Sequence, residues 1–326
     1  MPTLFDPPPS KLAQRLKELQ ERNIWIGTSS WKYEGWLGQV YSPERYQTRG
    51  RFSRKKFEET CLEEYAETFP IVCGDFSFYQ FPSADYWRKL FSSSPNSLRF
   101  AFKVPEDITV NVFPTHARYG RRAGQVNDNF LNADVFQRLF LEPLSLYGER
   151  AALFIFEFGT FSKKSFENAG QFVEALDRFL AAIPAGHRYA VEIRNPEYLG
   201  EEYFGCLRGR GVAHAFNAWS RMPPLETQIA LPGAFTADFT VVRALLRHGR
   251  MYEKAVEAFT PYDKIQDPNL EARKAMKTLI ARAELSKQGT YIFVNNRLEG
   301  NAPSTIEAIV DDGPEHAREP SLVHRA

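Results

Sequence analysis

Eight short apolar runs recur along the chain, and they constrain its fold more than any other feature of the sequence. Each run is rich in β-branched and aromatic residues. The runs cover residues 24–28, 71–78, 98–103, 151–158, 188–194, 212–217, 239–245 and 290–296. Near-continuous apolar runs are typical of strands covered on both faces, as in parallel sheets. We therefore predict eight buried parallel strands.

Helical patterns separate several of these runs. Residues 55–69, 165–184 and 269–289 each repeat apolar side chains at the spacing of one helix face. Strands that alternate with helices over 326 residues predict an α/β protein with a TIM-like (β/α)8 barrel. An open doubly wound sheet is the alternative, but no Gly-rich phosphate loop follows the first run.

One large domain accounts for most of the chain. Residues 23–311 are predicted to form the barrel domain, with a long loop after the first strand. Residues 1–22 are predicted to be a Pro-rich extension with an appended helix that carries Leu12, Leu16 and Leu19. Residues 312–326 are predicted to be a mobile tail.

Composition and charge indicate a globular protein and limit the partners that it could bind. The chain is 43% hydrophobic and 25% charged, as globular proteins are. Its net charge of +1 means that only local cation clusters could attract nucleic acid. Three widely spaced cysteines argue against a disulfide framework and a zinc knuckle. Without a signal peptide or an apolar run of about 18 residues, we expect a cytoplasmic protein with no membrane partner.

Charged and amide side chains gather where the predicted strands end. The carboxyl ends of TIM-barrel strands form the active-site face, so these side chains would meet at one mouth. Charges this close to a core are usually functional. For any single residue, an ion pair that only closes the barrel end, such as Glu192 with Arg243, is an equal alternative.

Proton transfer and anion binding would use different members of this set. Glu192 would act as general acid or base, with its pKa tuned by Arg194 and Arg243. Lys103 and Arg243 would hold phosphate charge, and Tyr79 would donate a proton or stack. We therefore predict catalytic roles for Glu192, Lys103, Arg243 and Tyr79. Substrate-binding roles are predicted for Trp31, Lys32, Tyr33, Asp75, Glu157, Arg194, Asn217, Asn295 and Asn296.

Metal ligands were sought among the six histidines. None of them has the spacing of a zinc motif, so no metal ligand is assigned. A Mg²⁺ ion on Asp75, Glu157 and Glu192 remains open, because hard cations need only oxygen ligands. No cofactor is firmly implied.

A cluster of six cations without an acid follows the first strand, in residues 45–56. Trp31, Tyr33, Trp36, Tyr41 and Tyr46 precede it or interleave with it. Such a mixture suits phosphates and stacked rings. Smaller basic clusters occupy residues 116–122 and 243–254, and a barrel would gather all three at its mouth. A solvated loop that charge keeps soluble is the alternative interpretation.

Six motifs occur in an order that is characteristic of one protein family. They are IGTSSWKYEGWLGQVYSPERY (26–46), DFSFYQFPSADYWRKL (75–90), LRFAFKVPEDIT (98–109), YAVEIRNPEYL (189–199), VVRALLRHG (241–249) and YIFVNNRLEGNAP (291–303). Over about residues 24–311 the chain thus resembles the DUF72 family, also called YecE-like proteins. The resemblance implies a TIM-barrel-like fold and no established activity.

The chain departs from the usual pattern of that family at the expected mouth. Cys73 stands where a glutamate is usual, and Asp75 where an asparagine is. Asn195 takes the place of a histidine, and Asn217 that of a frequent aspartate. Residues 157–160 read Glu-Phe-Gly-Thr instead of Gln-x-Pro-Pro. These differences indicate a divergent member.

Three functions remain open at this stage. The first is a hydrolase or lyase, metal-independent or Mg²⁺-dependent, that acts on a phosphate-bearing nucleotide or nucleic acid. The second is a non-catalytic nucleic-acid-binding protein. The third is a carbohydrate-active hydrolase with Glu157 and Glu192 as its carboxylates. A small anionic ligand or single-stranded nucleic acid is the expected partner, and whether the protein is an enzyme stays undecided.

Overall fold

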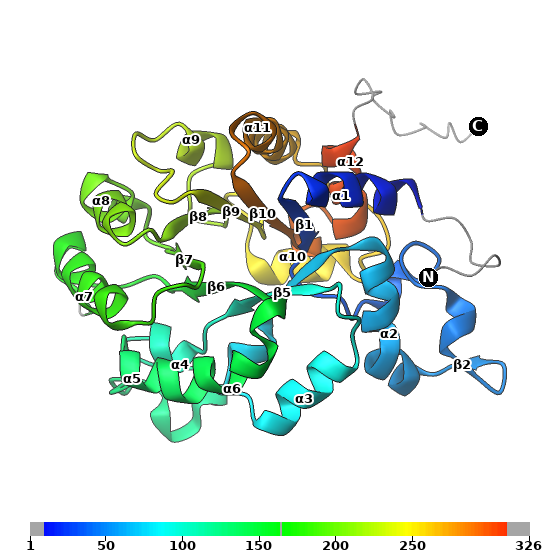
Figure 1. Cartoon of the computed structure of the whole chain (residues 1–326), viewed down its shortest axis with the longest axis horizontal. Coiled ribbons are helices and arrows are strands. Elements are labelled where there is room, and N and C mark those ends of the chain that lie inside the picture. The colour runs from blue at the N-terminus through cyan, green and yellow to red at the C-terminus, as the bar shows by residue number, and fades with distance from the viewer. Residues whose placement is uncertain (1–9, 164, 312–326) are drawn as a thin grey trace.

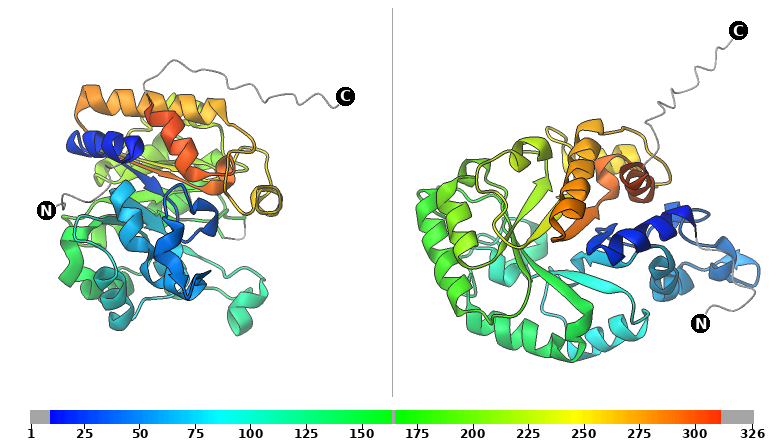
Figure 2. Two further views of the ribbon diagram at one scale, coloured as in Figure 1. Left: turned by 90° about the vertical axis from the view of Figure 1, so that its right-hand side faces the viewer. Right: turned by 45° about the horizontal axis from the view of Figure 1, so that its top comes forward.

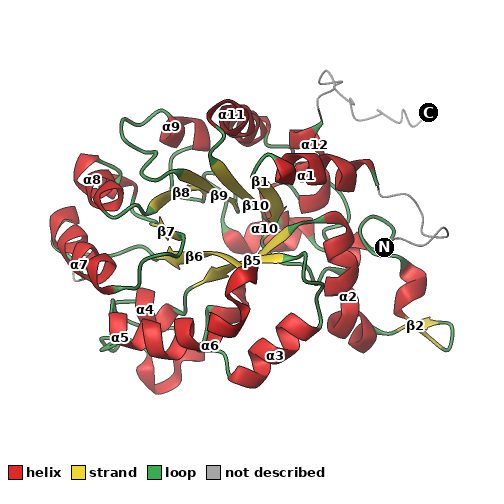
Figure 3. Ribbon diagram, viewed as in Figure 1, coloured by secondary structure: helices red, strands yellow, loops and turns green. Residues whose placement is uncertain are grey.

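The computed structural model describes residues 10–163 and 165–311, and eight parallel strands form a closed barrel at its centre. In chain order the strands are β1 (Ile24–Thr28), β4 (Ile71–Gly74), β5 (Arg99–Lys103), β6 (Ala151–Glu157), β7 (Tyr189–Glu192), β8 (Ala213–Ala218), β9 (Phe239–Ala244) and β10 (Gly289–Val294). The barrel closes where β1 pairs with both β10 and β4. Figures 1 and 3 show helices around the outside of these strands. The predicted TIM-like (β/α)8 barrel is confirmed.

Helices of very different lengths connect the strands. The longer ones are α1 (Lys11–Glu21), α2 (Arg54–Thr68), α3 (Ala84–Ser92), α7 (Ala169–Ala182), α8 (Glu201–Gly209), α10 (Tyr252–Phe259), α11 (Leu270–Ser286) and α12 (Ala302–Val310). The shorter ones are α4 (Glu106–Thr109), α5 (Ala133–Phe136), α6 (Glu142–Leu144) and α9 (Leu225–Ile229). The predicted helices 55–69, 165–184 and 269–289 correspond to α2, α7 and α11. Helix α7 begins later than predicted because the Asn168 side chain caps it by accepting from the backbone N–H of Gln171.

Several strands end earlier than the apolar runs that predict them. Strand β4 stops at Gly74, and a short 3-10 turn (Asp75–Ser77) follows it. The Ser77 hydroxyl donates to the carbonyl oxygen of Lys103 at 2.6 Å, which fixes this turn against β5. Strands β7 and β10 stop at Glu192 and Val294. The loops after these strands therefore contain Asp75, Arg194, Asn295 and Asn296.

The inside of the barrel is filled by small, branched and aromatic side chains. This apolar layer comprises Ile71, Cys73, Ala101, Leu153, Ile155, Ala190, Ala213, Ala215, Phe239, Val241, Tyr291 and Phe293, all buried. Strand β1 adds the half-buried Trp25, which packs against this layer, and otherwise presents Gly27. A Cβ on Gly27 would lie 1.9 Å from the carbonyl oxygen of Ile71, so only glycine allows β1 to approach β4 this closely.

A second and larger core lies between the strands and the helices. Alternate strand residues such as Val191 and Val242 point outward into it, as the period of two in a strand requires. Helix α1 joins this core through Leu16 and Leu19 and contacts both β1 and α12 (Figure 2). The helix predicted within residues 1–22 is thus present. The predicted mobile tail, residues 312–326, lies outside the described residues.

The long loop after β1 is largely a structural element. Its aromatic side chains Trp36, Tyr41 and Tyr46 are buried and pack against Phe57 of α2 or against one another. A small hairpin of β2 (Gln47–Thr48) and β3 (Arg51–Phe52) projects beyond α2 (Figure 1). In the described part of the chain, no helix is long and apolar enough to cross a membrane.

Candidate functional site

A ring of polar side chains follows the apolar layer at the carboxyl ends of the strands. Each member lies two residues after an inward position, and for the members that are still within a strand the period of two points the side chain into the barrel as well. This polar ring consists of Ser29, Asp75, Lys103, Glu157, Glu192, Asn217, Arg243 and Asn295, each from a different strand end. The predicted meeting of charged residues at one mouth is therefore present.

Arg243 lies at the centre of the polar ring. Its Nη1 atom donates to both Glu157 and Glu192, so the two carboxylates come within two hydrogen-bond lengths of each other. Glu192 has no exposed surface, and its other oxygen lies 2.5 Å from Nη2 of Arg194. The ion pair between Glu192 and Arg243, which the sequence allowed as a purely structural alternative, is thus formed.

Lys103 extends the network toward β4. Its ammonium group lies 2.8 Å from Asp75 and 3.1 Å from Glu157. It also lies 3.6 Å above the ring of Phe78, a cation–π contact that stabilises the charge from its apolar side. The Lys103 side chain is buried, whereas that of Asp75 is 47% exposed. Asp75 is therefore the carboxylate of this network that an anion from solvent can most easily replace on Lys103.

The charges of the network hold one another in the ionised state. Burial alone would raise the pKa of Glu157, but the three cations around it outweigh burial and hold that pKa well below its ordinary value. Burial would lower the pKa of Lys103, yet its carboxylate partners Glu157 and Asp75 raise it instead. The pKa of Arg243 is raised for the same reason, by Glu192 and Glu157 against the effect of burial. All three groups are therefore charged at neutral pH.

Several buried polar atoms of this cluster have no partner within the described residues. They are Nε and Nη1 of Arg194, Nε of Arg243, Oδ1 of Asn217 and, apart from its ion pair with Arg194, Oε1 of Glu192. Arg194 nevertheless has a fixed position, because its guanidinium group stacks 3.8 Å from the ring centre of Trp219. Buried donors normally find an acceptor, so these N–H groups indicate a place for one.

The amide side chains predicted to bind substrate serve the backbone. Asn217 is fully buried, and its Nδ2 donates to the carbonyl oxygens of Ile193 and Ala215 at 3.3 and 3.4 Å. Oδ1 of Asn295 accepts from the backbone N–H of Arg297, and Oδ1 of Asn296 from that of Ala302. These contacts join β8 to the residue that follows β7 and hold the loop after β10.

The predicted residues of the first loop lie apart from the cation cluster. Trp31 and Lys32 line a separate cavity of about 630 Å³ between α2 and α3, and Asp75 borders it as well. Tyr33 packs on Trp36 and against the edge of Tyr262. Burial raises the pKa of Tyr33, which makes it a poor proton donor.

Tyr79 lies at the rim of the site. Its side chain is 49% exposed, and the guanidinium group of Arg118 stacks 4.8 Å from its ring centre. Burial of its other half raises the pKa of the phenol. Tyr79 thus offers a ring face and a hydroxyl at the edge of the mouth rather than inside the cluster.

The basic loop of residues 45–56 offers fewer groups for binding phosphates and stacked rings than its composition indicates. Arg45 pairs with Glu67 at 2.6 Å, and Arg54 with Glu58 at 2.9 Å. The aromatic rings at positions 36, 41 and 46 are buried, so they are not available for stacking with bases. This loop is therefore mainly a packed element with a charged surface.

Metal binding finds little support in the arrangement of the carboxylates. Within residues 10–163 and 165–311, no group of three or more His, Cys, Asp or Glu residues could hold a metal ion. The carboxylates of Glu157 and Glu192 are instead bound to cationic side chains.

Two aromatic residues of the site were missed in the sequence. Phe78 lies under Lys103, and Trp219 lies under Arg194. Each follows a strand end by a few residues, which is a weak indication because aromatic residues are frequent throughout this chain. Their contacts depend on how the loops fold back over the mouth.

A family comparison agrees with this fold. The profile of "Protein of unknown function DUF72" matches residues 25–322. The chain belongs to the DUF72 family. It is also 25% identical over 195 residues to the UPF0759 protein YecE of Escherichia coli K12, and the same match is found with strain O157:H7. That match spans 58% of this chain and 57% of the length of YecE.

Solved structures of DUF72 family proteins share the barrel. One from Thermotoga maritima MSB8 has a TM-score of 0.56 and 24% sequence identity, with 87% of this chain and 96% of the other covered. One from Enterococcus faecalis V583 has a TM-score of 0.54 and 15% identity, with 88% and 94% covered. At these identities the likeness concerns the fold alone.

Proposed function

We propose that this DUF72 family protein binds a phosphate-bearing ligand at the carboxyl-terminal mouth of its barrel. The observation that carries the proposal is the buried cluster of Lys103, Arg194 and Arg243, whose two arginines keep N–H groups without an acceptor in the described residues. Three buried cations face the buried Glu192 and the partly exposed Glu157, which leaves one positive charge before the half-exposed Asp75 is counted. Phosphate oxygens accept strong charge-assisted hydrogen bonds from such groups.

Asp75 is the group that a phosphate would displace. It accepts from Lys103 at 2.8 Å and is the most exposed carboxylate of the network. A phosphate oxygen carries the same charge and can take its place on Lys103 while other oxygens reach Arg194. The ligand would then complete hydrogen bonds that the protein alone leaves unmade.

Glu192 positions the two arginines in this proposal instead of transferring a proton. It has no exposed surface, and both of its oxygens already contact the guanidinium groups of Arg194 and Arg243. The lowered pKa of Glu157 makes it a weak base and leaves it without the proton of a general acid. Binding is therefore better supported than hydrolase, lyase or glycosidase chemistry, because a glycosidase needs a protonated acid.

Thermal unfolding of the full chain with a panel of ligands tests the proposal. The panel contains inorganic phosphate, nucleotides, short oligonucleotides and neutral sugars, with and without Mg²⁺, at constant ionic strength. A ligand that binds only the folded state stabilises it by about 2.7 kcal/mol at a hundred times its dissociation constant. We expect the phosphate-bearing ligands to raise the melting temperature and the sugars to leave it unchanged.

Arg194→Gln is the informative variant. After its removal, Glu157 still has Lys103 and Arg243, and Glu192 still has Arg243, so no carboxylate is left unpaired. Arg178→Gln is the matched control, because Arg178 forms an exposed ion pair with Glu174 on the surface of α7. The stabilisation should disappear in Arg194→Gln and persist in the control. No stabilisation of the wild type by any phosphate-bearing ligand would overturn the proposed function.

A further inference from the structure

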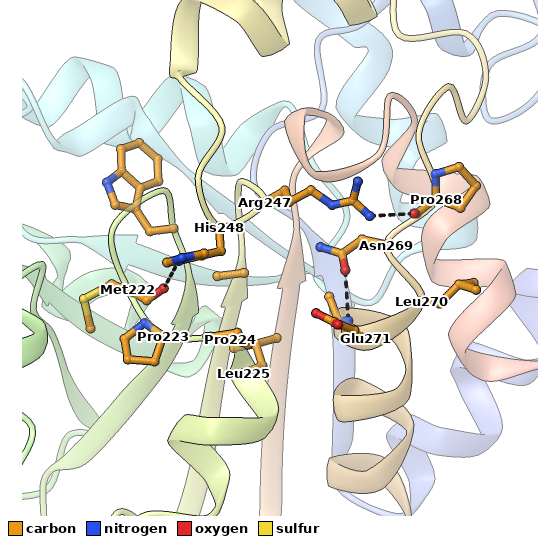
Figure 4. Close-up of a pocket in the computed structure, with 13 residues that line it drawn as sticks. Met222, Pro223, Pro224, Leu225, Arg247, His248, Pro268, Asn269, Leu270 and Glu271 are labelled. Atoms are coloured by element: carbon orange, nitrogen blue, oxygen red, sulfur yellow. Dashed lines mark hydrogen bonds between the residues drawn. The ribbon is translucent and has the colours of Figure 1, made fainter.

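A pocket of about 440 Å³ lies beside the polar ring, between the end of β8 and the start of α11. Its walls include Trp219, Met222, Pro223, Arg247, His248 and Leu270. Figure 4 shows Met222 and Pro223 on one side, Pro268 and Leu270 on the other, and Arg247 between them. The volume falls in the range of about 300–1,000 Å³ that is usual for small-molecule sites.

Trp219 belongs to both the pocket and the cation cluster. It lines the pocket, and the guanidinium group of Arg194 stacks 3.8 Å from its ring centre. The same guanidinium group contacts Glu192 and Glu157 through Nη2 and keeps Nε and Nη1 without a partner in the described residues. Trp219 therefore lies between the pocket and the unpaired N–H groups of Arg194.

We propose that this pocket binds the base of a mononucleotide whose phosphate lies at the polar ring. The inference rests on the proposed function and names its ligand class. The indole of Trp219 and the apolar ring surfaces of Pro223, Pro224 and Pro268 can pack against a planar ring. Every base has a π-face, so any of the bases can stack on an aromatic side chain.

His248 supplies a polar contact of the kind that a base needs. Its Nδ1 atom lies 2.8 Å from the carbonyl oxygen of Met222 (Figure 4). A carbonyl only accepts, so Nδ1 carries the hydrogen, and in the neutral imidazole Nε2 is left as an acceptor. An exocyclic amino group of a base can donate to this atom.

A free nucleotide fits the molecule better than a nucleic-acid strand. A strand needs a row of exposed aromatic rings and cations along its path. In the long loop after β1, Trp36, Tyr41 and Tyr46 are buried, so the exposed cations of residues 45–56 lack a row of stacking rings beside them. Trp219 both lines the pocket and contacts Arg194, so the pocket provides for one base.

Calorimetric titration of the full chain tests the inference. The ligands are inorganic phosphate, ribose 5-phosphate, adenosine, adenosine 5′-monophosphate (AMP) and a single-stranded tetranucleotide. We expect AMP to bind about tenfold or more tightly than ribose 5-phosphate, the factor that a stacking contribution of about 1.4 kcal/mol produces. The tetranucleotide should bind no more than about tenfold tighter than AMP, because a second stacked base would add at least that factor.

Three variants separate the pocket from the anion site. Trp219→Ala should remove the advantage of AMP over ribose 5-phosphate, and Trp219→Phe should keep most of it, because a ring face remains. His248→Ala should weaken AMP and leave inorganic phosphate unchanged. His187→Ala, an exposed histidine next to the start of β7, is the matched control and should alter neither.

The outcomes distinguish failure of this inference from failure of the proposed function. Equal affinities of AMP and ribose 5-phosphate for the wild type would overturn the inference and leave the anion site standing. A tetranucleotide bound far more tightly than AMP would overturn the mononucleotide in favour of a strand. Binding of adenosine without any phosphate binding would overturn both, because the pocket would then act apart from the polar ring.

Discussion

The interior of the barrel divides into the apolar layer and the polar ring, which lie only two residues apart on each strand. Ala101 and Lys103 illustrate the contrast on β5, and Ile155 and Glu157 on β6. The apolar layer removes hydrocarbon from water, which is the main source of folding stability. The polar ring takes charges out of water, which costs free energy that their mutual attraction only partly offsets.

This contrast teaches that stability alone does not explain the polar ring. Apolar residues of similar volume in place of a buried ion network often leave a protein equally stable or more stable. Arg243 of the ring and Arg194 beside it also keep donors without partners in the described residues, which a purely structural network would avoid. Both facts favour a ring kept for a ligand.

The largest expected effect comes from breaking the polar ring at its centre. Arg243→Met leaves Glu192 with Arg194 alone and removes one of three cations from Glu157. The loss of one partner of a buried ion network costs about 3–5 kcal/mol, and urea unfolding would measure it. Arg243→Met combined with Glu192→Gln should recover part of the loss. A cost below about 1 kcal/mol would mean that these charges are exposed to water.

The apolar layer should respond through cavity formation instead. Ile155→Ala deletes a fully buried side chain at the middle of the barrel and should cost about 2–5 kcal/mol, whereas Ile155→Val should cost about 0.5–1.5 kcal/mol. The same urea measurement applies. Equal costs for the two variants would show that packing at this position does not control stability.

A smaller effect should appear as a pH dependence that the polar ring has and the apolar layer lacks. Because the pKa of Glu157 is lowered by folding, the unfolded chain takes up the proton first as the pH falls. Stability from this group is complete above its ordinary pKa of 4.5 and is lost as the pH falls from there toward the folded pKa. One proton corresponds to a slope of about 1.4 kcal/mol per pH unit.

Glu157→Gln should therefore reduce the slope of the unfolding free energy against pH, on the acid side, by the contribution of one proton. Glu174→Gln on the surface of α7 is the control and should leave that limb nearly unchanged. Parallel acid limbs for the wild type and Glu157→Gln would show that the carboxyl group is not held ionised by its neighbours.

The sequence predicted the barrel and the charged core of the site for a common physical reason. Continuous apolar runs locate strands with two covered faces, and the strand ends follow directly from them. The period of two then places Lys103, Glu157 and Glu192 on the same side as the apolar residues before them. These inferences need only local sequence.

The rest of the site depends on contacts that local sequence does not contain. Asn295 and Asn296 have the residue type of a ligand-binding amide, but their oxygens cap backbone N–H groups after β10. Trp31 and Tyr41 look like stacking platforms, but they are buried among helices. Trp219 was overlooked because only the folded loop brings it against Arg194. The division into extension, barrel and tail stays a prediction.

The central claim is that the polar ring binds and the apolar layer holds the barrel together. Titration of inorganic phosphate into Ile155→Ala and Arg194→Gln, by calorimetry, tests it directly. The account predicts that Ile155→Ala, although less stable, binds phosphate as the wild type does. Arg194→Gln should bind it about tenfold or more weakly, since hydrogen bonds to charged groups are worth about 1.5–3 kcal/mol. Equal phosphate affinity in the two variants would contradict the account.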